Sequence, residues 1–320
     1  MTDKIIDIVV LIALPASGKS EVRKYLRSVP AAKCAEEFHL GPNVQFDDFP
    51  YVHMMRQIDT KLTEANKPSV FFSNNDKPFL DARDWGTLVE LVNEDYSDIV
   101  TKKELNPSSA AHYLFERIDA AGEKVGIPAR LSALDESVRN DIAVKLEEES
   151  LDLLKNKREL QTESLEGKTV VIEFARGGPD GSAMPLSGGY GYQYSLPLLS
   201  DEILEKAALF YIWVTPEESR HKNDNRADPN NPGSILHHGV PLDVMLNDYG
   251  CDDVAWLEEH SERPGTITVK AHGKTFYLPF ARFDNRVDKT DFIRNDQASW
   301  KPEQVASIHG SLKEAFDKLV

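Results

Sequence analysis

The chain is poor in cysteine: its 320 residues include only Cys34 and Cys251, which lie far apart in the sequence. No CxxC pair and no zinc-ligand spacing is present, so neither a disulfide framework nor a structural zinc site is indicated. Two reduced thiols are typical of a cytosolic protein, and we expect a cytoplasmic location. No hydrophobic run reaches the length of a transmembrane helix, so no membrane association is expected.

Basic residues are also in short supply. The chain has 37 Lys and Arg against 53 Asp and Glu, which gives a net charge of −16. This charge opposes loose binding to nucleic acid or to an anionic membrane, because both depend on a positive surface. A local basic pocket for a nucleotide is still compatible with it. The 41% of hydrophobic residues is enough for a sizeable core, and the length indicates one large domain or a domain with an insertion.

The most informative segment follows the first predicted strand. Residues 5–12 read IIDIVVLI, and residues 13–20 read ALPASGKS. The second segment fits the pattern [A/G]-x-x-x-x-G-K-[S/T] of the P-loop, and a helical pattern follows from Glu21 to Arg27. Strand, loop and helix in this order are the context that a P-loop requires. The segment therefore predicts the binding of a nucleoside triphosphate.

The predicted triphosphate site is the loop itself. Backbone N–H groups at a helix start point at one spot, and the helix dipole adds positive potential there. Gly18 lets the backbone approach the phosphates, Lys19 reaches the β- and γ-phosphates, and Ser20 ligates Mg²⁺. Ala13 stands where a glycine is usual, which weakens the match slightly. The expected nucleotide-binding residues of this segment are Ala13, Pro15, Ala16, Ser17, Gly18, Lys19, Ser20 and Glu21.

Two acidic residues stand at the ends of further predicted strands. The strand predicted at residues 43–46 is followed directly by Asp47-Asp48. The β-branched run at residues 168–175 carries Glu173 near its end. Ligands of parallel sheets bind at the carboxyl ends of the strands. We therefore expect Lys19, Asp47 and Glu173 to converge on one cleft.

The rest of the chain predicts the fold class. Residues 51–166 are mostly helical in pattern and are predicted to form an insertion or substrate cap; residues 1–50 and 167–320 alternate strands with helices and form the nucleotide-binding core with its lid. Residues 266–269 and 275–278 flank a His-Gly-Lys turn and predict a hairpin. We predict an α/β fold: a three-layer α/β/α sandwich with a mainly parallel sheet, a helical insertion and a C-terminal β-hairpin.

This order of segments resembles that of the P-loop kinases of small molecules, which include uridine-kinase-like, phosphoribulokinase-like, zeta-toxin-like and gluconate-kinase-like P-loop NTPases. In that plan, a P-loop strand is followed by an acidic residue that ends the next strand, a Walker B-type strand and a basic lid. The resemblance covers most of the chain except the insertion, and only the P-loop is specific as a motif. It implies an ATP- and Mg²⁺-dependent kinase that acts on a hydroxyl of a small metabolite such as a nucleoside, a sugar or a nucleotide sugar.

The resemblance also implies roles for the acidic residues. Asp47-Asp48-Phe49 is similar to the D-[S/D]-[F/Y] element, in which the first Asp accepts or orients the proton of the attacking hydroxyl. Asp47 is the expected base, Asp48 is the alternative, and a turn role before Pro50 stays open. Glu173 is expected to hold a water on Mg²⁺, with an ion pair to Lys19 as the alternative. The expected metal-binding residues are Ser20, Asp47 and, through water, Glu173.

A basic segment after the fourth predicted strand resembles the lid. In residues 218–226, ESRHKNDNR, Arg220 and Arg226 are expected to clamp the transferring phosphate, and a solvated helix is the alternative. Asn285, after the last strand, is expected to contact adenine unless it only forms a turn. The glycine- and tyrosine-rich residues 188–192 are compatible with a flap over the acceptor or with a plain surface loop. The expected catalytic residues are Lys19, Asp47, Arg220 and Arg226.

Two other functions stay open. One is a P-loop ATPase or nucleotide-dependent switch without a small-molecule acceptor, in which the helical region would bind a partner. The other is a polynucleotide kinase, which the net charge of −16 disfavours because single strands bind in basic grooves. The sequence does not identify the acceptor, and it does not distinguish ATP from GTP.

Overall fold

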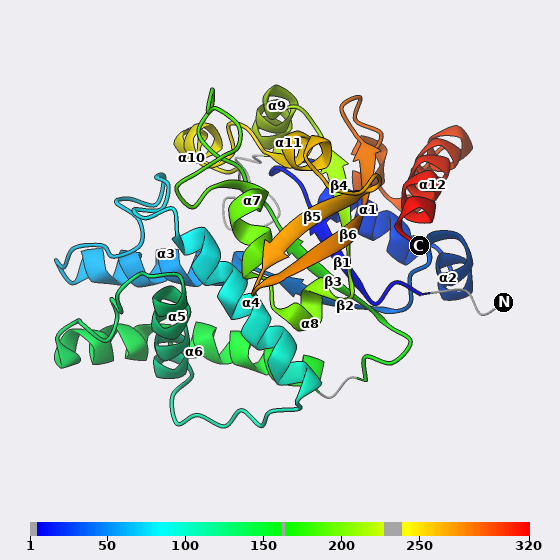
Figure 1. The fold of residues 1–320 in the computed structure, drawn as a ribbon. Helices are drawn as coiled ribbons and strands as arrows, with labels where there is room; N and C mark the ends of the chain where they lie inside the picture. Colours follow the sequence, from blue (N-terminus) through cyan, green and yellow to red (C-terminus); the bar gives the residue numbers. More distant parts are fainter. Residues whose placement is uncertain (1–4, 162–163, 227–238) are drawn as a thin grey trace.

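The fold is organised around a six-stranded sheet with the strand order β2-β3-β1-β4-β6-β5 (Figure 1). The computed structural model describes residues 5–161, 164–226 and 239–320. All neighbouring strands are parallel except β5 and β6, which form an antiparallel hairpin. The strands are β1 (Ile8–Ile12), β2 (Asn43–Asp47), β3 (Thr169–Phe174), β4 (Ala207–Trp213), β5 (Thr266–Ala271) and β6 (Lys274–Asp284).

Helices cover both faces of this sheet, so the predicted α/β fold is confirmed (Figure 1). Among the residues that the structure describes, no helix is long and apolar enough to cross a membrane. The helices are α1 (Lys19–Ser28), α2 (Ala31–Phe38), α3 (Phe49–Glu64), α4 (Asp84–Val100), α5 (Ala110–Lys124), α6 (Glu136–Gln161), α7 (Gly191–Ser195), α8 (Asp201–Leu204), α9 (Pro216–Arg226), α10 (Leu242–Asn247), α11 (Val254–Glu259) and α12 (Pro302–Phe316). Short 3₁₀ segments are η1 (Leu196–Leu198), η2 (Asp291–Arg294), η3 (Gln297–Ser299) and η4 (Asp317–Leu319).

The central strand β1 is buried on both faces, which explains its uninterrupted apolar sequence. Val9 and Leu11 pack with residues of α1 and α12. Val10 and Ile12 point the other way and pack with residues of α4, α7 and α8. Because side chains alternate along a strand, one apolar run supplies two cores.

The long strand β6 takes part in both kinds of pairing. Its first half, residues 274–279, pairs antiparallel with β5. Its second half, residues 280–284, pairs parallel with β4 and ends beside Trp213. The predicted C-terminal hairpin is therefore confirmed, and it belongs to the main sheet rather than standing apart from it.

The predicted helical insertion is present as α4–α6, and its first helix joins it to the sheet. Val89 and Val92 of α4 pack in the core on the sheet. Leu88 and Leu91 pack in a second core with residues of α3, α5 and α6. With apolar residues on two sides, α4 belongs to both cores, so the insertion is packed firmly on the sheet.

Helix α3 begins at Phe49, directly after Asp48 and two residues before the predicted start of the mostly helical region. Proline is favoured in the first helical turn, where its missing N–H is not needed. The buried residues Met54, Met55, Ile58 and Leu62 recur at helical spacing, which was the available signal.

Buried charges tie the insertion together. Arg117 of α5 donates to Asp95 Oδ1 over 2.6 Å and to the Tyr51 hydroxyl over 3.1 Å. Lys157 Nζ of α6 lies 2.7 Å from Asp95 and 2.6 Å from Asp98. Arg117 and Lys157 are both buried. Buried ions are stable only when paired, so this network fixes how α3, α4, α5 and α6 pack.

We expect Arg117→Met to destabilise the protein by about 2–3 kcal/mol, because the partly buried Asp95 loses one of its two charged partners and keeps Lys157. Urea unfolding followed by circular dichroism measures this change. The control is Lys145→Met, which removes an exposed pair with Asp141 and should change little. Equal effects of the two substitutions would show that the network does not stabilise the insertion.

Candidate functional site

The loop between β1 and α1 has the backbone conformation of an anion-binding nest. Ala16 has φ 55° and Gly18 has φ 105°, both in the left-handed region. A Cβ on Gly18 would lie 2.7 Å from Asn285 Nδ2 and 2.7 Å from Thr290 Oγ1, so a larger residue does not fit. Ala13 has no positive φ, so the alanine at the usual glycine position carries no conformational cost.

Side chains from distant segments hold the loop carbonyls. The Ala13 carbonyl accepts from the Tyr192 hydroxyl over 3.2 Å, and Ala13 itself is fully buried. The Pro15 carbonyl accepts from the Ser219 hydroxyl of α9 over 2.7 Å. Since Tyr192 is also fully buried, this end of the glycine- and tyrosine-rich segment supports the P-loop rather than covering an acceptor.

Asn285 is a third brace of the same loop. Its Nδ2 donates to the Ser17 carbonyl over 2.7 Å and to Thr290 Oγ1 over 3.0 Å. Its Oδ1 accepts from the Lys289 N–H over 2.7 Å. The side chain is fully buried, and both of its polar groups are engaged inside the protein. The expected contact of Asn285 with adenine therefore has no support in this geometry.

A cavity of about 410 Å³ lies over the loop, at the carboxyl ends of β2 and β3. Asp47 stands opposite Glu173 in the register of these strands, and both line the cavity together with Asp48. The structure thus brings Lys19, Asp47 and Glu173 to one cleft, as the strand order predicts. The P-loop residues that line it are Pro15, Ala16, Ser17, Lys19 and Ser20.

Asp48 is committed to a buried ion pair. Arg176 Nη1 donates to Asp48 Oδ2 over 2.6 Å, and the arginine is 1% exposed. The same guanidinium donates to the Trp85 carbonyl and to Ser195 Oγ, over 3.1 Å each. Arg176 was not among the predicted site residues, since its only signal in the sequence was a basic residue directly after a buried strand.

Asp47 is left as the carboxylate beside Lys19. Its Oδ1 accepts from the Phe49 N–H over 2.9 Å at the start of α3. Burial, with the neighbouring Glu173 and Asp48 carboxylates, raises the pKa of Asp47 to about 7, although Lys19 opposes the shift. A carboxylate with a pKa near neutrality is suited to accept a proton.

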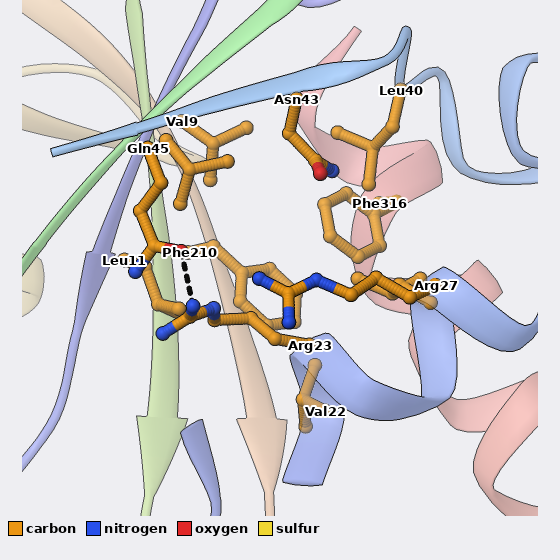
Figure 2. A pocket seen from close by; sticks show the side chains of 12 residues that line it. Val9, Leu11, Val22, Arg23, Arg27, Leu40, Asn43, Gln45, Phe210 and Phe316 are labelled. Atoms are coloured by element: carbon orange, nitrogen blue, oxygen red, sulfur yellow. Dashed lines mark hydrogen bonds between the residues drawn. The ribbon is translucent and has the colours of Figure 1, made fainter. Parts of the chain in front are cut away.

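Glu173 pairs with Arg23 of α1. Arg23 Nη1, one helical turn after Lys19, donates to Glu173 Oε2 over 2.8 Å. Figure 2 shows Arg23 reaching from α1 to Gln45 of β2, to which it also donates a hydrogen bond. The space around Arg23 and Arg27 in this view is a cavity of about 30 Å³, room for about one water molecule and not for a nucleotide.

The predicted lid falls on α9. Arg220 Nη2 lies 3.5 Å from Glu217 Oε1. Arg220 Nη1 is buried and has no hydrogen-bond partner among the residues that the structure describes. Lys222 is buried and pairs with Asp288 over 3.1 Å. Arg226 is the last residue of α9, and its side chain lies outside the described part of the chain.

Glu21 does not line the cavity. Its Oε1 accepts from Arg294 Nε over 3.1 Å, and Glu21 is buried. This ion pair ties α1 to η2, so Glu21 supports the helix that begins at the P-loop. Ala13 and Gly18 likewise shape the loop without lining the cavity.

The site fits a polyphosphate with a magnesium ion. Ser17 Oγ, at the cavity, is a buried donor without a hydrogen-bond partner in the described residues, and so is Arg220 Nη1 on α9, which lies outside the cavity lining. Both groups suit an anion. In the same residues, no group of three or more His, Cys, Asp or Glu is placed to hold a metal. Mg²⁺ that binds with a nucleotide takes most ligands from phosphate and water, so the Ser20 hydroxyl, with Glu173 acting through a water, would suffice on the protein side.

Comparisons with known proteins assign no family. No family model, no curated protein and no solved structure matches the chain. The fold and the site therefore define the class alone: an α/β protein with a mostly parallel sheet and a cavity at the carboxyl ends of its strands.

Asp47→Asn should stabilise the ligand-free protein more at pH 8 than at pH 5. The pKa of Asp47 rises from 3.8 to about 7 on folding, so the folded state holds this proton more tightly. The stability that the proton provides is complete below pH 3.8 and is lost as the pH rises through about 7. Melting temperatures at both pH values test this, with the surface change Asp141→Asn as control. If the Asp47→Asn variant melted at a lower temperature than the wild-type protein at pH 8, the burial of this charge would be contradicted.

Asn285→Ala should weaken the binding of tripolyphosphate and of ATP to the same extent, by about tenfold, because a lost hydrogen bond loosens the loop. Titration calorimetry with both ligands measures the two effects. Asn295→Ala, an exposed position ten residues later in the chain, is the control. A loss confined to ATP would instead mean that Asn285 contacts the base.

Proposed function

We propose that the chain is an ATP- and Mg²⁺-dependent kinase that transfers a phosphoryl group to a hydroxyl of a small metabolite such as a nucleoside, a sugar or a nucleotide sugar. The observation that carries the proposal is one cavity that joins the P-loop to Asp47. A triphosphate on the loop and a hydroxyl at Asp47 would meet there. This reading groups the chain with the P-loop small-molecule kinases.

The nucleotide half of the reaction rests on the nest and on the start of α1. The N–H groups that follow Ala16 and Gly18 hold the β- and γ-phosphates, and Lys19 adds a positive charge to them. Ser20 would hold the metal, which neutralises charge on the phosphates when it is bound. Three braces keep the loop in place before any ligand arrives, so binding costs little reorganisation.

The acceptor half rests on the unequal environments of two neighbouring carboxylates. Asp48 is neutralised by Arg176, whereas burial and the neighbouring carboxylates raise the pKa of Asp47 to about 7. Asp47 is therefore the group that orients the acceptor hydroxyl and takes its proton. Glu173, held by Arg23, faces the same space and would orient a metal-bound water.

The lid helix supplies charge to the transferred group. Arg220 Nη1 is a buried donor without a hydrogen-bond partner among the described residues, and a guanidinium binds phosphate oxygens well. Ser219, next to it, holds α9 against the P-loop. Arg226 stays a second expected clamp. Closure of such a site excludes water, which limits hydrolysis of ATP.

The size of the cavity limits the acceptor. About 410 Å³ lies within the usual range for small-molecule sites. A polynucleotide would need an open basic groove, whereas this chain has a net charge of −16. The two free cysteines support the cytoplasmic location that we expect.

The direct test is the transfer of labelled γ-phosphate from ATP to a pooled metabolite extract. Wild-type protein should yield a labelled product that Lys19→Ala does not, and chromatography of the product identifies the acceptor. Label found only as inorganic phosphate would favour an ATPase or a nucleotide-dependent switch. Labelling of an added oligonucleotide would favour a polynucleotide kinase.

Asp47→Ala should lower kcat by about 10²–10⁴ while ATP still binds, because loss of a general base removes about that factor. Steady-state kinetics with the identified acceptor, together with calorimetry of ATP, separate the two effects. Asp141→Asn on the surface of α6 should leave both unchanged. Unaltered transfer by Asp47→Ala would show that the assigned base is wrong.

A further inference from the structure

The side of the cavity away from the P-loop has an aromatic wall. Its rings come from separate segments: Phe49 begins α3, Phe79 precedes α4, Trp85 lies in α4, and Tyr249 follows α10. Phe79 meets Trp85 edge to face at 4.9 Å, and Trp85 meets Tyr249 at 5.6 Å between ring centroids. The proposed transfer of phosphate does not use these rings.

Phe49 stands out on this wall because it is exposed. The ring is 45% exposed, although it lines the cavity and follows Asp48 directly. Phe79 and Tyr249 are 8% and 9% exposed. An apolar ring that faces water gains free energy when a ligand covers it. The exposed ring therefore lies two residues from the proposed base, where an acceptor must sit.

The two arginines near the aromatic wall, Arg56 and Arg176, already have partners within the protein. The Arg56 guanidinium lies 3.9 Å from the centroid of the Phe72 ring and donates to the carbonyls of Asn75 and Lys77. Arg176 is paired with Asp48 and is 1% exposed. An acceptor with a phosphate group of its own would find no uncommitted arginine on this side of the described cavity.

One carboxyl group offers polar recognition at the wall. Asp248 lines the cavity and is 2% exposed. Burial raises the pKa of Asp248 to about 7, against the effects of Trp85 and Arg56. A buried carboxyl group at the wall is suited to a hydrogen bond from a ligand.

We propose that the acceptor is an alcohol that carries a flat, uncharged heterocycle, as a nucleoside does, with the ring against Phe49 and Tyr249 and a ring N–H or O–H donating to Asp248. This inference rests on the proposed function and names its substrate class. Rings of any base stack on aromatic side chains, because every base has a π-face.

The wall favours this class over a free sugar or a nucleotide sugar. A free sugar carries a hydroxyl on most of its carbons, and each one that is buried needs a partner. Phenylalanine rings and aliphatic side chains such as Val52 and Val244 offer none. A nucleotide sugar brings a diphosphate, whose charge would need Arg56 or Arg176, and both are engaged within the protein.

Equilibrium binding without ATP tests the inference separately from catalysis. The probes are adenosine, guanosine, cytidine and uridine, with ribose and glucose as the sugar set; the readout is calorimetry of the wild-type protein. At least one nucleoside should bind at least about tenfold more tightly than either sugar, because one stacked ring is worth about that factor. Sugar binding as tight as the tightest nucleoside, or no nucleoside binding, would overturn the inference.

Variants locate the binding. Phe49→Ala should weaken binding of that nucleoside by about tenfold, and Phe49→Tyr should preserve it. Asp248→Asn should weaken it further, because an amide presents donors where a carboxylate accepts. Val144→Ala, an exposed apolar position on α6 away from the cavity, is the control. Unchanged binding by Phe49→Ala would overturn the placement of the ring.

The two proposals fail differently. Nucleoside binding without Lys19-dependent transfer would end the kinase proposal and leave the ring site standing. Lys19-dependent transfer to a sugar, without nucleoside binding, would do the reverse.

Discussion

The buried ion pair of Arg176 and Asp48 is the interaction on which the rest of the site depends. A guanidinium has fixed donor directions and cannot lose its charge, so its partners must stand where the donors point. Here those partners are Asp48 before α3, the Trp85 carbonyl in α4 and Ser195 in α7. One side chain thus relates the sheet to the insertion. It also neutralises Asp48, which distinguishes this carboxylate from its neighbour Asp47.

Side chains from distant parts of the sheet, and not only contacts within the loop, hold the P-loop in its conformation. Its carbonyls at alternate positions accept hydrogen bonds from side chains that follow three different strands. These pairs are Ala13 with Tyr192, Pro15 with Ser219, and Ser17 with Asn285. Because the carbonyls are engaged on the protein side, the loop keeps a fixed shape, which is the condition for binding phosphate without paying for order.

Local patterns predicted what depends on local sequence. The apolar strands, the P-loop and the hairpin follow from spacing alone, and the convergence of Lys19, Asp47 and Glu173 follows from parallel strand order. The partners of charged groups could not be predicted in this way, because they lie far away along the chain. Arg176 is 128 residues from Asp48, and no pattern near either one relates them. Asn285 has the sequence context of a turn, and only the fold shows that it faces the P-loop.

The length of strand β6 determines where Asn285 lies relative to the P-loop. The Asn285 N–H donates to the Trp213 carbonyl at the very end of this strand, and the side chain then reaches Ser17. A strand advances about 3.3 Å per residue and alternates its faces. Loss of one residue from residues 280–284 would therefore shift and invert Asn285, whereas a change in the turn at Gly273 would leave it in place. Natural variation in length should accordingly be tolerated at the tip of the hairpin and excluded from its inner half.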